Sequence, residues 1–375
     1  MGGTATPQRH DCDDGDDYDD YDDYGDYDDD NGALMLSTPL EFMGAPGSPY
    51  SRKMRALLRY RRIPHIVYAQ GSEEVATRPR AKPPLLPTFF LPDEKGEIVA
   101  VTDSTPLIRR FEIEFEGRSV VPPDPVMAFL DLLIEDYADE WLTKCMFHYR
   151  WYYAADAKKA GSVLPHWAKI DVSDAEIAPV QKLITERQIG RLGVVGSNDV
   201  TAPVIEDSYR RFLRIFDAHL QKSRFLFGAR PSAADFALAG QLTCLALFDP
   251  TPAAVTLEES PRIHAWVEGI EELSGLTVDD EDWIVRGAVS ETLKALLGEV
   301  GRVHAPFLLA NAAALEGGAD QVKTVIDGKP WVQKPFPYQG KCLRWLREAR
   351  DALNPVDRAA VDALLKGSGC ESLFI

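Results

Sequence analysis

Ser48 stands where the sequence predicts the end of a strand and the start of a helix. An apolar run at 40–43 is followed by GAPG at 44–47, and Pro49 comes directly after Ser48. A serine hydroxyl can accept from a free amide of the first helical turn, where a proline sacrifices no hydrogen bond. Because free amides and the positive end of the helix dipole meet there, Ser48 can help to hold an anion such as a thiolate. The simpler interpretation is a helix cap only, and Ser51, one turn further on, is a second candidate hydroxyl.

Two further loop positions next to predicted strands or helices follow along the chain. Leu86 and Pro87 precede an apolar segment, TFFL, that predicts a strand. Asp103 and Ser104 follow a second predicted strand at 98–102 and precede TPLI, which predicts the start of another helix. Either of these two polar residues can cap that helix by the same reasoning as the serine above.

The order of these segments resembles the thioredoxin-like N-terminal half of glutathione transferases. It consists of a strand, the helix that begins SPYSRKMR, a strand, the proline-led strand, a further strand and the helix after the Asp-Ser pair. The resemblance implies that Ser48 faces the sulfur of glutathione. It also implies a cis peptide bond before Pro87 and pairing of the Leu86 backbone with the tripeptide. Asp103 and Ser104 would then hold its γ-glutamyl end.

A second pattern lies about 130 residues further on, within FLFGARPSAADF at 225–236. Ser232 and Asp235 have the spacing of a capping box, in which the two residues satisfy each other's free amides at a helix start. The pattern resembles the C-terminal helical domain of glutathione transferases, where it starts a core helix. Together the two patterns extend the resemblance over roughly residues 34–276.

The predicted fold is an α/β thioredoxin-like domain followed by an all-α domain of the glutathione transferase C-terminal type. The predicted parts are an acidic tail at 1–32, a glutathione-binding domain at 34–117, a helical domain at 125–276 and an extension at 277–375. The extension should be mostly helical with one hairpin, because Asp327-Gly328 suits a tight turn between strands. Its aromatic residues indicate that it packs on the rest, where it either covers the active-site cleft or forms an interface.

Three groups of charged residues have open interpretations. The first helix is basic, which indicates mostly a solvent-facing side, with some residues able to steer an anion: Arg52, Lys53, Arg55, Arg59, Arg61 and Arg62. The loop before Pro87 holds cations that either bind the glycine carboxylate of glutathione or are solvated: Arg78, Arg80 and Lys82. A helix at 126–153 holds charges that form ion pairs or the wall of a second-substrate pocket: Glu135, Asp136, Asp139, Glu140, Lys144, His148 and Arg150.

Composition narrows the class of protein. The 375 residues are enough for two domains, and they contain no apolar run that could span a bilayer and no signal pattern at the start. The five cysteines lie far apart, which argues against a disulfide framework and against a thiolate metal site. We therefore expect a cytoplasmic protein that binds no metal and no membrane.

The net charge of −18 is concentrated at the N-terminus. Residues 1–32 hold thirteen aspartates and one arginine, a charge of −12, so that −6 belongs to the rest of the chain. Dense like charge without apolar periodicity predicts a disordered tail. The sign of the charge disfavours nucleic acid as a partner.

These observations predict an enzyme that activates the thiol of glutathione, its co-substrate, for attack on a small electrophile or a peroxide. Ser48 would be the catalytic residue; a homodimer is left open. The rival from another class is a non-catalytic binding or assembly module, because a fold can be reused without its chemistry. A thiol-disulfide exchanger is disfavoured, since it needs a cysteine where this chain has Ser48.

Overall fold

The computed structural model describes residues 36–375, so the predicted tail at 1–32 lies outside the described residues. The first part is a four-stranded sheet with the order β2-β1-β3-β4. Its strands are β1 (Leu40–Gly44), β2 (His65–Ala69), β3 (Thr88–Pro92) and β4 (Ile98–Val101). The pair β1-β2 is parallel, whereas β3 runs antiparallel to both of its neighbours.

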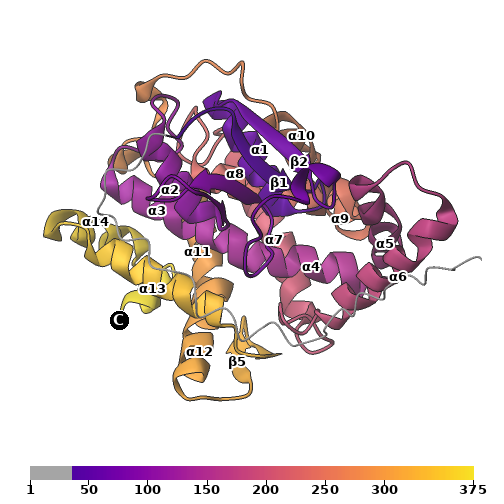
Figure 1. Cartoon of the computed structure of the whole chain (residues 1–375). Helices are drawn as coiled ribbons and strands as arrows, with labels where there is room; N and C mark the ends of the chain where they lie inside the picture. Colours follow the sequence, from indigo (N-terminus) through magenta and orange to yellow (C-terminus); the bar gives the residue numbers. More distant parts are fainter. Residues whose placement is uncertain (1–35) are drawn as a thin grey trace, which may run out of the picture.

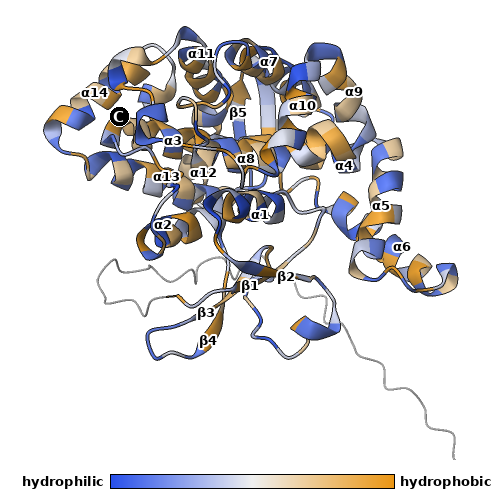
Figure 2. Cartoon of the chain, turned by 90° about the horizontal axis from the view of Figure 1, so that it is seen from above, coloured by the Kyte–Doolittle hydropathy of each residue, from blue (hydrophilic) through white to orange (hydrophobic). Residues whose placement is uncertain are grey.

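Two helices cover one face of this sheet. A parallel strand pair needs a crossover, and α1 (Pro49–Arg61) supplies it between β1 and β2. The second helix, α2 (Ser104–Glu114), follows β4. Figure 2 shows both helices between the sheet and the helical part of the chain, and α1 packs on α8 (Ala233–Leu242) there. The start of α1 therefore lies where the two parts meet.

The helical part confirms the predicted all-α architecture. Its first long helix runs continuously from α3 (Pro125–Tyr137) through a π-helical turn (Ala138–Leu142) into α4 (Thr143–Tyr152). The other helices are α5 (Ala154–Ala168), α6 (Asp174–Gly190), α7 (Ala202–Leu220), α8, α9 (Pro250–Glu259) and α10 (Pro261–Ile270). Ser232 caps α8, and its capping box with Asp235 is formed as predicted.

The extension contains the predicted helices and hairpin. Its elements are α11 (Glu291–Glu299), α12 (Ala305–Glu316), β5 (Val322–Ile326), β6 (Lys329–Gln333), α13 (Pro337–Asp351) and α14 (Pro355–Leu365). The hairpin turn has positive φ at both Asp327 (51°) and Gly328 (72°), as a primed turn requires.

The extension packs on the helical part and shares its core. Its buried Trp331 and Leu343 belong to the same apolar cluster as Trp141 of the long helix. Helices α13 and α14 lie along α3 (Figure 1). This arrangement confirms the expectation that the extension packs, whereas the domain bounds inferred from the sequence stay predictions. Among the described residues, no helix is both long enough and apolar enough to cross a membrane.

Candidate active site

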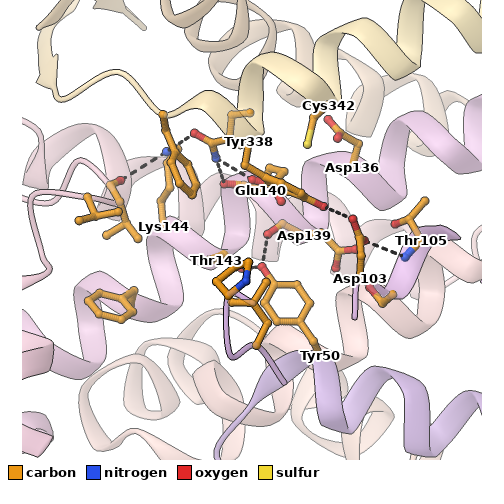
Figure 3. A pocket seen from close by; sticks show the side chains of 18 of the residues that line it. Tyr50, Asp103, Thr105, Asp136, Asp139, Glu140, Thr143, Lys144, Tyr338 and Cys342 are labelled. Atoms are coloured by element: carbon orange, nitrogen blue, oxygen red, sulfur yellow. Dashed lines mark hydrogen bonds between the residues drawn. The ribbon is translucent and has the colours of Figure 1, made fainter. Parts of the chain in front are cut away.

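A cavity of about 370 Å³ lies where the sheet domain, the long helix and the extension meet. The loop at 83–87 and the residues at 103–105 form its wall on the side of the sheet. The long helix, the end of α6 and the first turns of α13 form the remaining wall. Figure 3 shows these side chains converging from separate elements. The extension therefore completes the wall of this cavity.

Four of the five sequence-predicted site residues line this cavity. They are Leu86, Pro87, Asp103 and Ser104. The peptide bond between Leu86 and Pro87 is cis. Within residues 36–375, neither the amide nor the carbonyl of Leu86 has a hydrogen-bond partner. The backbone of Leu86 is therefore available to a ligand with peptide character.

Ser48 lies at the N-terminus of α1, as predicted, and is half-buried. Its hydroxyl oxygen accepts a hydrogen bond from the Ser51 amide at 3.2 Å. Among the described residues that line the cavity, α1 contributes Tyr50 and not Ser48. The hydroxyl oxygen of Ser51, the second candidate, accepts from the Ala45 amide at 3.2 Å. The catalytic role of Ser48 stays a prediction.

Tyr50 is engaged by the helical part of the chain. Its hydroxyl donates to the Asp139 carbonyl at 2.7 Å and lies 2.8 Å from Thr143 Oγ1. Burial raises the pKa of Tyr50 well above its usual value, and the carboxylates of Glu140 and Asp139 raise it further. This hydroxyl therefore stays protonated and joins α1 to the long helix.

Asp103 is held by two donors from different parts of the chain. Its Oδ1 accepts from the Thr105 amide at 3.3 Å, which makes Asp103 the cap of α2. Its Oδ2 accepts from the Tyr338 hydroxyl of α13 at 2.8 Å (Figure 3). Burial raises the pKa of Asp103, and the bond from Tyr338 opposes that shift.

Lys53 corrects the expectation that the basic side of α1 faces solvent. Its ammonium is buried and contacts Glu135 Oε1 at 2.7 Å, Asp139 Oδ2 at 2.6 Å and Ser104 Oγ at 3.0 Å. Burial alone would lower the pKa of Lys53, but the two carboxylates outweigh burial and raise it. Lys53 thereby fixes the Ser104 hydroxyl in the cavity wall.

Other cations of α1, and Arg78 of the basic loop, are also paired. Arg61 is buried against Glu112, and both Arg52 and Arg55 contact Glu271. In the basic loop, Arg78 pairs with Glu41 and lies outside the cavity wall.

The acidic part of the long helix forms ion pairs and also part of the cavity wall. Glu135 and Asp139 form the ion pairs with Lys53, while Asp136 and Glu140 line the cavity. Asp136 Oδ2 lies 2.6 Å from His304 Nε2 of the extension.

Lys144 and Glu140 are linked through one side chain of the extension. The Lys144 ammonium donates to Gln339 Oε1 at 3.2 Å, and Gln339 Nε2 donates to Glu140 Oε2 at 2.8 Å. Lys144 also lies 4.0 Å from the centre of the Phe307 ring. Burial lowers the pKa of Lys144 to about 7 and raises that of Glu140 to about 8. Gln339 therefore carries a hydrogen-bonded chain between an acid and a base.

His148 lies away from this chain. Its Nδ1 is 2.7 Å from Ser197 Oγ and its Nε2 is 3.2 Å from Glu206 Oε1. His148 does not line the cavity in the described structure. Residues 36–375 also contain no cluster of three or more side chains that could hold a metal ion.

The comparison with protein-family models finds two matches in the expected order. Residues 42–119 match the model described as "Glutathione S-transferase, N-terminal domain". Residues 185–269 match the model described as "Glutathione S-transferase, C-terminal domain". The chain from α11 onward lies outside both matches. No curated protein sequence gives a significant match to this chain.

Several solved structures are similar to this chain at low identity. One is a glutathione transferase family member from Pseudomonas fluorescens Pf-5 with two glutathione bound, at 14% identity and a TM-score of 0.39; 62% of this chain and 92% of that chain are covered. Another is a glutathione S-transferase from Methylobacterium radiotolerans in complex with glutathione sulfonate, at 17% identity and a TM-score of 0.31. This match covers 66% of this chain and 99% of that chain. A third is a Tau class glutathione S-transferase from mango, Mangifera indica, at 16% identity and a TM-score of 0.37. This match covers 68% of this chain and 98% of that chain.

Proposed function

The chain belongs to the glutathione S-transferase superfamily, and we propose that it is an enzyme that activates the glutathione thiol for attack on a small apolar electrophile or a peroxide. The observation that carries this proposal is the cavity between the Leu86-Pro87 loop, the Asp103-Ser104 pair and the long helix. These are the positions that the family pattern assigns to the tripeptide.

Binding of glutathione would use both hydrogen-bond donors and acceptors of the cavity wall. The unpaired amide and carbonyl of Leu86 would pair with the peptide backbone. Asp103 would accept from the ammonium of the γ-glutamyl end, and the Ser104 hydroxyl, fixed by Lys53, would donate to its carboxylate. Charge-assisted bonds of this kind are stronger than neutral ones, which favours a single orientation.

Activation of the thiol would fall to Ser48 and the helix that it caps. A free thiol has a pKa of about 8.5, so most of it is protonated at neutral pH. The amides at the N-terminus of α1 and a donated hydroxyl proton both favour the thiolate, which is the nucleophile. The Ser48 oxygen accepts from the Ser51 amide, which leaves its proton free to be donated.

The second substrate would occupy the apolar part of the cavity. Its wall there includes Leu132, Phe147, Val195, Phe336 and Trp345. Apolar walls with a few polar groups are typical of small-molecule sites. The proposal places the enzyme in the cytoplasm, where glutathione keeps thiols reduced. The four cysteines of the described chain are all free.

A Ser48→Ala variant tests this proposal, with Ser162→Ala on the exposed side of α5 as the matched control. We expect Ser48→Ala to lower kcat for chlorodinitrobenzene by about 100-fold, the magnitude seen when one donor to a developing anion is removed. Loss of the cap should cost about 1 kcal/mol of stability, which thermal melting measures separately. Equal rates for the two variants would remove Ser48 from the mechanism. Calorimetric glutathione binding by wild type without turnover of any electrophile would favour the non-catalytic module.

A further inference from the structure

Glu140 is a cavity-lining carboxyl group that none of the steps above uses. The residue is 7% exposed, and it lines the cavity. Its Oε2 accepts from Gln339 Nε2, while its Oε1 has no hydrogen-bond partner within residues 36–375. Oε1 is not one of the fully buried unpartnered atoms in this part of the chain, so it retains some accessible surface. One carboxyl oxygen is therefore positioned by the protein, and the other is open to the cavity.

The other carboxyl groups of the cavity wall are differently placed. Asp103 is held by Thr105 and Tyr338, and Asp136 by His304. Asp139 is paired with Lys53 through Oδ2, and its Oδ1 is buried without a partner. Glu140 thus has one carboxyl oxygen fixed by Gln339 and a second that is free to meet a ligand in the cavity.

The backbone supports a functional role at this position. Glu140 lies in the π-helical turn Ala138–Leu142, which interrupts the α-helical run of the long helix. Such turns are rare and are frequent at functional sites. Here the turn buries the neighbouring residues Asp139 and Glu140 together, the first against Lys53 and the second against Gln339.

We propose, resting on the function proposed above, that Glu140 is the general acid for addition of glutathione to α,β-unsaturated carbonyl compounds. The thiolate forms a C–S bond to the β-carbon, and the electron pair of the C=C bond moves to the α-carbon and carbonyl oxygen. Glu140 donates its proton to the resulting enolate and becomes a carboxylate. Water returns a proton to Glu140, and the next glutathione releases its thiol proton to solvent. The substrate class is therefore an apolar enal or enone.

Charged and titratable groups from every neighbouring element bear on Glu140. The pKa of Glu140 is raised to about 8, mostly by burial and further by the carboxylates of Asp136 and Asp139. Gln339 and Lys144 oppose the shift. The charge of the Glu140 carboxylate in turn raises the pKa values of Tyr50, Tyr338 and Cys342. Glu140 thus holds a proton at neutral pH, close to the pKa at which a general acid is most effective.

Two electrophile classes separate this role from a structural one. Addition to an alkenal needs a proton on the product, whereas displacement from chlorodinitrobenzene forms a C–S bond, breaks a C–Cl bond and releases chloride without protonation. We expect Glu140→Gln to lower kcat for hexenal by about 100-fold, the lower range for loss of a general acid, and to change kcat for chlorodinitrobenzene less than threefold. Gln retains an oxygen that can accept from Gln339. Glu206→Gln, outside the cavity, should leave both rates unchanged.

Wild-type enzyme provides a second measurement that needs no variant. Its kcat for hexenal should fall above a pH of about 8 and show a solvent deuterium isotope effect, neither of which should appear with chlorodinitrobenzene. Equal loss of both activities in Glu140→Gln, or unchanged hexenal turnover, would overturn the assignment. Turnover of chlorodinitrobenzene with no turnover of hexenal by wild type would reject the substrate class and leave the proposed function standing. No turnover of either electrophile by wild type would reject both.

Discussion

Tyr338 donates a hydrogen bond to Asp103 across 235 positions of sequence. Tyr338 belongs to the first turn of α13 in the extension, and Asp103 caps α2 next to the sheet. This contact lies beside the cavity, and α13 forms part of the cavity wall. In the proposed enzyme, the extension would therefore be part of the glutathione site.

Replacement of Tyr338 by phenylalanine should weaken glutathione binding. Burial raises the pKa of Asp103, and the Tyr338 hydrogen bond opposes that rise. Without the Tyr338 hydrogen bond, the pKa of Asp103 rises, and the ionised form that would receive the γ-glutamyl ammonium is less favoured. We expect Tyr338→Phe to raise KM for glutathione about tenfold, or about 1.4 kcal/mol, with kcat changed less than twofold.

Tyr152→Phe is the matched control for this experiment. The Tyr152 hydroxyl donates to Asp199 at 2.8 Å, and the residue does not line the cavity within the described chain. Its loss should leave both KM and kcat unchanged. A lower KM in Tyr338→Phe would show instead that Tyr338 competes with glutathione for Asp103.

Loss of the Lys53 ammonium should destabilise the fold strongly. Lys53→Met leaves Glu135 and Asp139 buried without their cation, and removal of one partner from a buried ion pair costs about 3–5 kcal/mol. Without Lys53 the folded-state pKa values of both carboxyls rise, so the stability deficit should grow as pH rises through those values. Urea unfolding at about pH 5 and about pH 8 measures both effects. Lys294→Met, which removes an exposed pair with Glu291, should change stability by less than about 1 kcal/mol at either pH.

Asp235 should contribute to stability and not to binding. Its carboxyl group accepts from the amides of Leu226 and Ser232 and from the Ser232 hydroxyl, all of them buried. Asp235→Ala leaves those donors unsatisfied, and we expect a loss of about 2–4 kcal/mol in urea unfolding. Asp174→Ala, at the exposed start of α6, is the control and should cost less than about 1 kcal/mol. A loss below about 1 kcal/mol for Asp235→Ala would contradict the capping box as a source of stability.

Local signals explain why so much of the fold could be predicted from the sequence. Ser48-Pro49, Asp103 and Ser232 with Asp235 each act within one helical turn, so residue type and spacing are sufficient evidence. The hairpin turn at 327–328 is local in the same way. By contrast, α5, α9 and α10 are not among the elements expected from the sequence.

The contacts that build the cavity are not local, which is why the sequence could not supply them. In the sequence, Lys53 cannot be told apart from the other cations of a basic helix. Its burial is explained by its partners on α3 and in the π-helical turn, which lie far away in the sequence. Gln339 carries no motif, yet it links Glu140 to Lys144 across about 200 positions. A π-helical turn also lacks a sequence signature of its own. Sequence reasoning identified Glu140 and Lys144 only as members of a charged group with two interpretations.

The stability of a Lys144→Met variant relative to wild type should depend on pH. Burial lowers the pKa of Lys144 to about 7, from 10.5 when solvated. Between these values the unfolded chain binds the proton and the folded chain releases it, so this lysine makes wild type more stable as pH rises. The difference in free energy of unfolding, Met variant minus wild type, should therefore fall between about pH 7.5 and about pH 9.5. The lysine alone contributes up to about 1.4 kcal/mol per pH unit to this fall.

Two further points make the experiment on Lys144 decisive. Lys144 lowers the pKa of Glu140, so its removal raises that pKa further. An acid whose folded-state pKa is raised loses stability as pH rises, which acts in the same direction as the loss of the lysine. Urea unfolding at three pH values measures the slope. Lys182→Met on the exposed side of α6 should show a difference from wild type that does not change with pH. A constant difference for Lys144→Met as well would mean that Lys144 keeps its proton in the folded protein, held by Gln339 and the Phe307 ring.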